Sequence, residues 1–76
     1  MLLAQTTEEE ISDRNGEIPA GFLFASVKNI GTEPVTVNGV PLEAGKAKSY
    51  PFVGKGQQAI SYQVGPTGRL LLMITI

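Results

Sequence analysis

The sequence predicts an all-β protein, a compact antiparallel β-sandwich or small open barrel of about six strands that follows a short acidic N-terminal arm. Gly, Pro and Asn recur at short, regular intervals from residue 21 onward, as they do in chains of many short strands. The segments between these turn residues are rich in β-branched and aromatic residues, which favour strands. A chain of 76 residues has room for one such domain.

Residues 1–20 differ from the rest of the chain, because five acidic residues stand there against one basic residue, Arg14. Thr7 and Glu10 have the spacing of a capping box, which predicts a short helix. Glu10 and Arg14 are spaced to form an ion pair along such a helix. A helix this short is marginal by itself, so the alternative is an extended or disordered arm.

Residues 21–76 form the predicted β-sandwich domain. Asn38-Gly39 between apolar residues predicts a tight hairpin, because both central positions of a type I′ turn need a positive φ. Pro51 can donate no ladder hydrogen bond, which places its strand at a sheet edge or at a bulge. The expected strands cover residues 22–29, 35–37, a return strand from 40, 47–53, 58–64 and 69–76.

Two of the expected strands are apolar on both faces, whereas a strand over a single small core needs only one apolar face. On the last strand Leu71 and Met73 lie opposite an equally apolar row, and on the first strand Leu23 and Ala25 do the same. Large apolar patches on proteins usually mark interfaces. We therefore expect Leu71, Met73, Leu23 and Ala25 to form the interface of a homo-oligomer, a trimer or larger.

Self-association would also give a domain of this size the extra stabilisation that small scaffolds need. The chain has no Cys, so it cannot obtain that stabilisation from disulfides. The alternative cover for the apolar face is the arm itself, folded back so that Leu2, Leu3 and Ile11 lie on it.

The sequence lacks the side chains of the commonest catalytic and metal sites. It has no His and no Cys, so the usual general base, thiol nucleophile and zinc ligands are missing. We expect no enzymatic activity, no cofactor and no metal. The formal net charge is −1, and the basic residues are scattered along the chain, so they do not form a basic stripe that would bind nucleic acid. The longest apolar run, residues 70–74, is far shorter than the roughly 20 residues of a membrane span, so we expect a soluble protein without a signal peptide.

Tyr50 and Tyr62 fall on consecutive expected strands and are the candidate ligand surface. Side by side they would form a stacking platform, with Gln57, Gln58 or Gln63 nearby to bind polar groups. The chain would then be a small carbohydrate- or peptide-binding module rather than a structural protein. The alternative is that both rings cap the edge of the core and leave their hydroxyls in solvent.

The stretch from residue 27 to residue 45 resembles small β-proteins encoded by tailed phages and prophages. The motifs that carry the resemblance are Asn29-x-Gly31, Pro34-Val35-x-Val37, Gly39-x-x-Leu42-x-x-Gly45 and, further on, Ser49-Tyr50-Pro51. The resemblance implies a structural or accessory role in a virion, with other structural proteins of a symmetric assembly as partners. It implies no catalytic residue, and the acidic arm is not part of the pattern.

Overall fold

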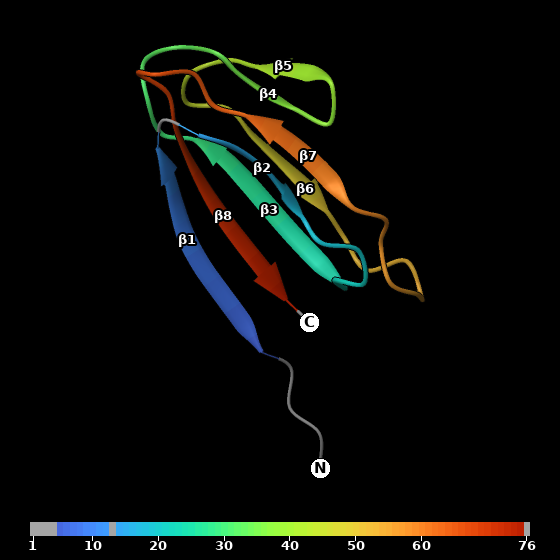
Figure 1. Cartoon of the computed structure of the whole chain (residues 1–76). Helices are drawn as coiled ribbons and strands as arrows, with labels where there is room; N and C mark the ends of the chain where they lie inside the picture. Colours follow the sequence, from blue (N-terminus) through green and yellow to red (C-terminus); the bar gives the residue numbers. More distant parts are fainter. Residues whose placement is uncertain (1–4, 13, 76) are drawn as a thin grey trace.

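The computed structural model describes residues 5–12 and 14–75, which form two four-stranded antiparallel sheets around one core (Figure 1). The first sheet has the strand order β1-β8-β3-β6 and the second has the order β2-β7-β4-β5. In chain order the strands are β1 Thr6–Ser12, β2 Asn15–Ile18, β3 Phe24–Asn29, β4 Val35–Val37, β5 Val40–Leu42, β6 Ala47–Tyr50, β7 Ile60–Gln63 and β8 Arg69–Thr75. These residues contain no helix, hence none of a length and apolar character suited to crossing a membrane, and the all-β prediction is confirmed.

The six strands expected after residue 21 all form, as β3 to β8. The hairpin between β4 and β5 is confirmed, because Asn38 and Gly39 have φ values of 53° and 77° and Val37 pairs with Val40. β6 is an edge strand and ends directly before Pro51, as the missing N–H of proline requires.

Of the alternatives left open for residues 1–20, the described residues form no helix but are extended, in strands that pair with the two sheets. Thr6–Ser12 is β1, which pairs along its whole length with β8, and Asn15–Ile18 is β2, which pairs with β7. One continuous stretch thus supplies an edge strand to each sheet (Figure 1). The physical reason is that Ile11 is fully buried in the shared core and the β8 backbone completes a ladder, whereas an isolated short helix would have neither.

The acidic residues of β1 lie along an exposed sheet edge. Glu9 pairs with Arg14 at 3.1 Å, and Glu10 pairs with Arg69 of β8, so the expected pair between Glu10 and Arg14 is not formed. Glu8, Glu9 and Glu10 follow one another along this free edge. Like charges in such a row oppose pairing with the same edge of another copy.

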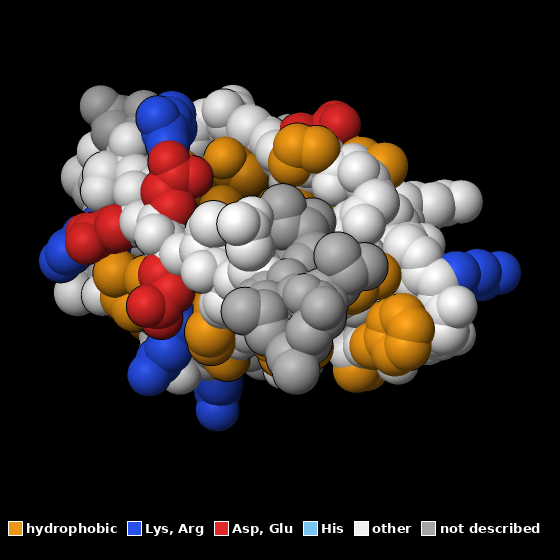
Figure 2. All heavy atoms as spheres, turned by 90° about the horizontal axis from the view of Figure 1, so that it is seen from below, with side chains coloured by type: hydrophobic (Ala, Val, Ile, Leu, Met, Phe, Trp, Pro, Cys, Tyr) orange, Lys and Arg blue, Asp and Glu red, His pale blue; other side chains and the backbone are white. Residues whose placement is uncertain are grey.

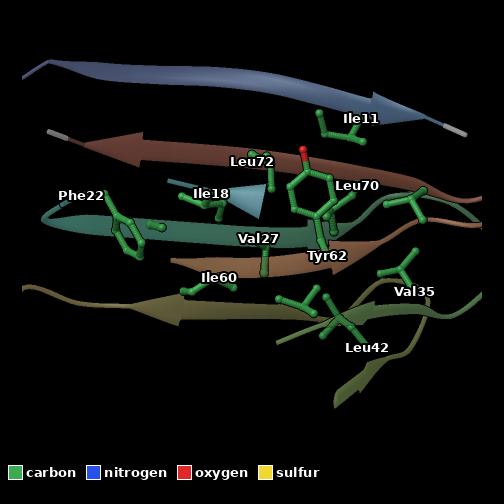
Figure 3. Packing of buried hydrophobic residues seen from close by; sticks show 13 residues of the cluster. Ile11, Ile18, Phe22, Val27, Val35, Leu42, Ile60, Tyr62, Leu70 and Leu72 are labelled. Carbon is green, nitrogen blue, oxygen red and sulfur yellow. The ribbon is translucent and has the colours of Figure 1, made fainter. Parts of the chain in front are cut away.

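The core lies between the two sheets, and side chains from both contribute to it (Figure 3). Strands β1, β3 and β8 supply one layer, and β2, β4, β5 and β7 supply the facing layer. Its buried hydrophobic residues are Ile11, Ile18, Phe22, Ala25, Val27, Val35, Val37, Leu42, Ile60, Tyr62, Val64, Leu70 and Leu72.

One polar side chain, Asn29, is fully buried among the described residues. Its Nδ2 donates hydrogen bonds to the carbonyl oxygens of Glu33 at 2.8 Å and of Leu42 at 2.9 Å, and its Oδ1 accepts one from the Gly31 N–H at 3.0 Å. Each polar atom of this side chain therefore has a partner, as burial requires. The hydrogen bonds of Asn29 therefore connect the turn after β3 to the end of β5.

Candidate functional site

The residues predicted to form an oligomer interface divide between the core and the outside of the first sheet. Leu71 and Met73 are half-buried and alternate along β8 with core residues, so they lie on its outward side. Ala25 is 0% exposed and belongs to the core, so its assignment to the outer face is wrong. Leu23 is half-buried and directly precedes β3.

The error at Ala25 comes from the start of the strand. β3 begins at Phe24, while Phe22 is buried in the irregular segment before it, so the alternation expected from residue 22 does not hold. Both alternating sets of residues 22–25 are apolar, and hydrophobicity alone does not tell them apart. The polar residues Ser26 and Lys28 carried the missing signal, because they share the outward side with Phe24.

The strand register arranges the outward side chains of the first sheet in rows across β1, β8 and β3. In one row Leu71 lies between Glu10 and Lys28, and in the next Met73 lies between Glu8 and Ser26. An apolar centre is thus flanked by acidic residues on one side and by a lysine on the other. Figure 2 shows acidic side chains gathered on the side of the molecule where β1 lies. We call this surface the outer face and define it as Glu8, Glu10, Phe24, Ser26, Lys28, Arg69, Leu71 and Met73.

The alternative cover for this face, a folded-back arm, is not what the described residues form. Ile11 points into the core between the sheets (Figure 3). Leu2 and Leu3 lie outside the described residues.

Tyr50 and Tyr62 do not form a common platform. Tyr62 projects from β7 into the core (Figure 3) and is 8% exposed, so its assignment to a ligand surface is wrong. The two tyrosines belong to different sheets, because the chain crosses from β6 to β7 between them. Gly16 on the neighbouring strand β2 makes room for the inward ring, since a Cβ there would lie 2.5 Å from the Tyr62 hydroxyl oxygen.

Tyr50 instead lines a pocket of about 260 Å³. The end of β6, the turn between β4 and β5, and the segment that leads into β7 surround it. None of the lining residues is charged. They are Asn38, Tyr50, Gln57, Gln58, Ala59 and Ile60.

Gln57 is held in the pocket wall by both its backbone and its side chain. Its N–H donates to the Phe22 carbonyl at 2.9 Å, and its carbonyl accepts from the Gly21 N–H at 2.8 Å. Its Nε2 donates to the Pro51 carbonyl at 2.8 Å, which closes the base of the loop between β6 and β7. The wall is therefore positioned before any ligand binds. The Tyr50 hydroxyl is buried and has no hydrogen-bond partner in the part of the chain that the structure describes.

The described residues bring together no group of three or more His, Cys, Asp or Glu side chains that would hold a metal ion. Comparisons with protein-family models, with curated proteins and with solved structures give no match. Within the described residues, the outer face and the pocket are the candidate sites.

Proposed function

We propose that this protein is a non-catalytic structural protein whose copies associate through the outer face. The observation that carries the proposal is the pair Leu71 and Met73 on the outward side of β8, a central strand whose inward side is already filled by Leu70 and Leu72. Strands that are apolar on both sides are typical of sheets covered on both faces. The first sheet has its own core on one face only.

A second copy of the chain suits the outer face, because its apolar centre can pair with itself and its acidic side with Lys28 across a two-fold axis. Rotation by 180° about an axis along β8 places Leu71 opposite Leu71 and Met73 opposite Met73 of the other copy. Arg69, which shares the outward side of β8, would lie opposite Arg69, with its charge offset by the pair with Glu10 of its own copy. The same rotation exchanges the positions of β1 and β3, so that Glu10 of each copy lies opposite Lys28 of the other. Two-fold pairing of this kind is the commonest symmetry of soluble oligomers.

The size of the outer face suits a weak contact that is repeated in an assembly. Three strands of six or seven residues, spaced about 4.8 Å apart with about 3.3 Å per residue, present roughly 300 Å² per subunit. That is less than half of the roughly 800 Å² that each partner buries in a standard stable interface. An isolated pair should therefore dissociate on dilution, and the trimer or larger assembly expected from the sequence needs a second contact. A virion, which the resemblance to phage proteins implies, would supply many such contacts.

The test is Met73→Glu, which places two carboxylates opposite each other across the proposed axis. We expect the wild-type chain to have a mass above 8.1 kDa that rises with concentration in sedimentation equilibrium, and the Met73→Glu variant to stay at 8.1 kDa. The variant should keep the circular dichroism spectrum of the folded wild type, because Met73 lies outside the core cluster.

Gln63→Glu is the matched control, because it adds the same charge at an exposed position of β7 in the second sheet. It should associate as the wild type does. Equal association of Met73→Glu and the wild type would remove the outer face from the contact. Unfolding of Met73→Glu would place Met73 in the core and would also contradict the proposal.

A further inference from the structure

We propose that the pocket beside Tyr50 binds a neutral carbohydrate through a single sugar ring. This inference is independent of self-association, because the pocket and the outer face have no residue in common. It rests on the chemistry of the lining, on the size of the pocket and on the way its wall is held.

The lining suits hydroxyl groups. The amides of Asn38, Gln57 and Gln58 each offer both donors and acceptors, and so does every sugar hydroxyl. A planar amide can therefore bind two neighbouring hydroxyls at once, donating to one and accepting from the other. Asn38 and Gln58 are exposed and can reach a ligand, while Gln57 keeps its Oε1 as an acceptor because only its Nε2 is used by Pro51.

The rest of the lining suits the less polar side of a sugar ring. Half-buried Tyr50 supplies an aromatic surface against which the C–H groups of a ring can pack, and the core residue Ile60, 5% exposed, lies beside it. With no charged residue in the lining, neither a phosphate nor a carboxylate would find a counter-ion there. A neutral, polyhydroxylated ligand matches both halves of the pocket.

The size of the pocket sets the size of the ligand. Its volume of about 260 Å³ is slightly below the roughly 300–1,000 Å³ of pockets that hold drug-sized ligands. One ring fits this volume, and further sugars of a chain would extend into solvent. A peptide is less suited, because it would need a ladder with an edge strand, and β6 offers only Ala47–Tyr50 before Pro51 interrupts it.

The experiment is a titration of ¹⁵N-labelled protein with the methyl glycosides of glucose, galactose, mannose and N-acetylglucosamine, followed by NMR. The side-chain NH₂ signals of Asn38, Gln57 and Gln58 report on the contacts directly. A ligand with so few atoms should have a dissociation constant on the order of 1 mM. We expect saturable shifts in these signals and in the backbone amides of residues 57–60 for at least one glycoside.

Two variants remove hydrogen bonds to the sugar without disturbing the fold. Asn38→Gly keeps a residue that tolerates the positive φ of the turn, and Gln58→Ala changes an exposed side chain. Each should weaken binding about fivefold, as expected for one lost hydrogen bond. Gln63→Ala is the control, since this exposed glutamine of β7 is not among the pocket residues, and it should bind as the wild type does.

Three results would overturn the assignment. The first is the absence of saturable shifts with all four glycosides. The second is binding that Asn38→Gly and Gln58→Ala leave unchanged. The third is a set of shifts along Ala47–Tyr50 on addition of a blocked, uncharged pentapeptide in place of a sugar, which would make the site a peptide groove.

Discussion

At the scale of single residues, Asn29 shows how one buried amide organises several turns. Its side chain makes three hydrogen bonds, to Gly31, Glu33 and Leu42, and its backbone also pairs with the segment before β6, through the Gly45 N–H and the Lys46 carbonyl. Leu42 lies 13 residues further along the chain, so the amide connects the turn after β3 with a strand outside that turn. The motif Asn29-x-Gly31 follows from this geometry, since the Gly31 N–H donates to Asn29 Oδ1 and a Cβ at Gly31 would lie 3.0 Å from the backbone nitrogen of Arg69.

The first prediction concerns Asn29→Ala. The substitution leaves the Glu33 and Leu42 carbonyls without their donor, so we expect the free energy of unfolding to fall by about 2–4 kcal/mol. Urea denaturation followed by circular dichroism measures the change. Asn15→Ala is the matched control, because the exposed Asn15 accepts a single hydrogen bond from the Val64 N–H and should cost about 1 kcal/mol. Equal losses for the two variants would contradict the role given to Asn29.

At the scale of elements, β1 is the strand in which the structure differs most from the sequence-based prediction, because it pairs with β8 along its whole length. It carries one buried apolar residue, Ile11, which is 0% exposed and pairs with Leu70 of β8. The rest of β1 is polar and exposed. A strand of this kind depends on its ladder with the neighbouring strand and on one anchor in the core.

The second prediction is that Ile11→Ala lowers the free energy of unfolding by about 2–4 kcal/mol, because it leaves a cavity in a filled core. If β1 were a separate arm, the same substitution would leave the free energy of unfolding unchanged. Val40→Ala, at a position that is 48% exposed, should cost less than about 0.5 kcal/mol and serves as the control. A thermal unfolding curve for Ile11→Ala that coincides with that of Val40→Ala would show that β1 is not docked.

The third prediction concerns the hairpin between β4 and β5. Gly39 has a φ of 77°, which a β-branched residue adopts only at a cost of roughly 1 kcal/mol or more, so Gly39→Val should lower the melting temperature. Gly65→Val is the control, since Gly65 has no such φ and a Cβ there would meet nothing within 4 Å. A hairpin of another type would be indicated if the two variants melted together.

The turns and the strands of residues 21–76 could be read from the sequence, because Asn38-Gly39, Pro51 and the glycine-rich turns act locally. The formation of a strand by Thr6–Ser12 could not be predicted in this way. Its capping-box pattern is a real local preference, and tertiary pairing with β8 overrides it. Nothing within the segment itself encodes that partner.

The candidate site follows the same division. The alternation along β8 was enough to predict that Leu71 and Met73 lie on its outward side. The side of the sheet on which Ala25 lies depends on the residue where β3 begins, and a run of apolar residues does not show where that is. Tyr50 and Tyr62 were expected together because they fall on consecutive strands, but the chain crosses from one sheet to the other between these strands. The pocket at Tyr50 includes Asn38, which comes near only through the pairing of β4 with β7.

At the scale of the whole molecule, the two sheets leave different surfaces for different partners. The acidic edge strand β1 disfavours association at its own edge, and the contact that we propose between copies uses the outer face instead. The pocket beside Tyr50 lies between the end of β6 and the β4–β5 turn and shares no residue with that face. The two proposals therefore concern separate surfaces of one small domain, the outer face for a second copy and the pocket for a small ligand.

The measurement that tests the central claim most directly is sedimentation equilibrium of the wild-type chain over a wide range of concentrations. Self-association through the outer face predicts an apparent mass that equals 8.1 kDa in dilute solution and rises with protein concentration. The interface is small, so the rise should begin only at roughly micromolar concentrations or above. A constant mass of 8.1 kDa up to the highest concentration at which the protein stays in solution would contradict the account.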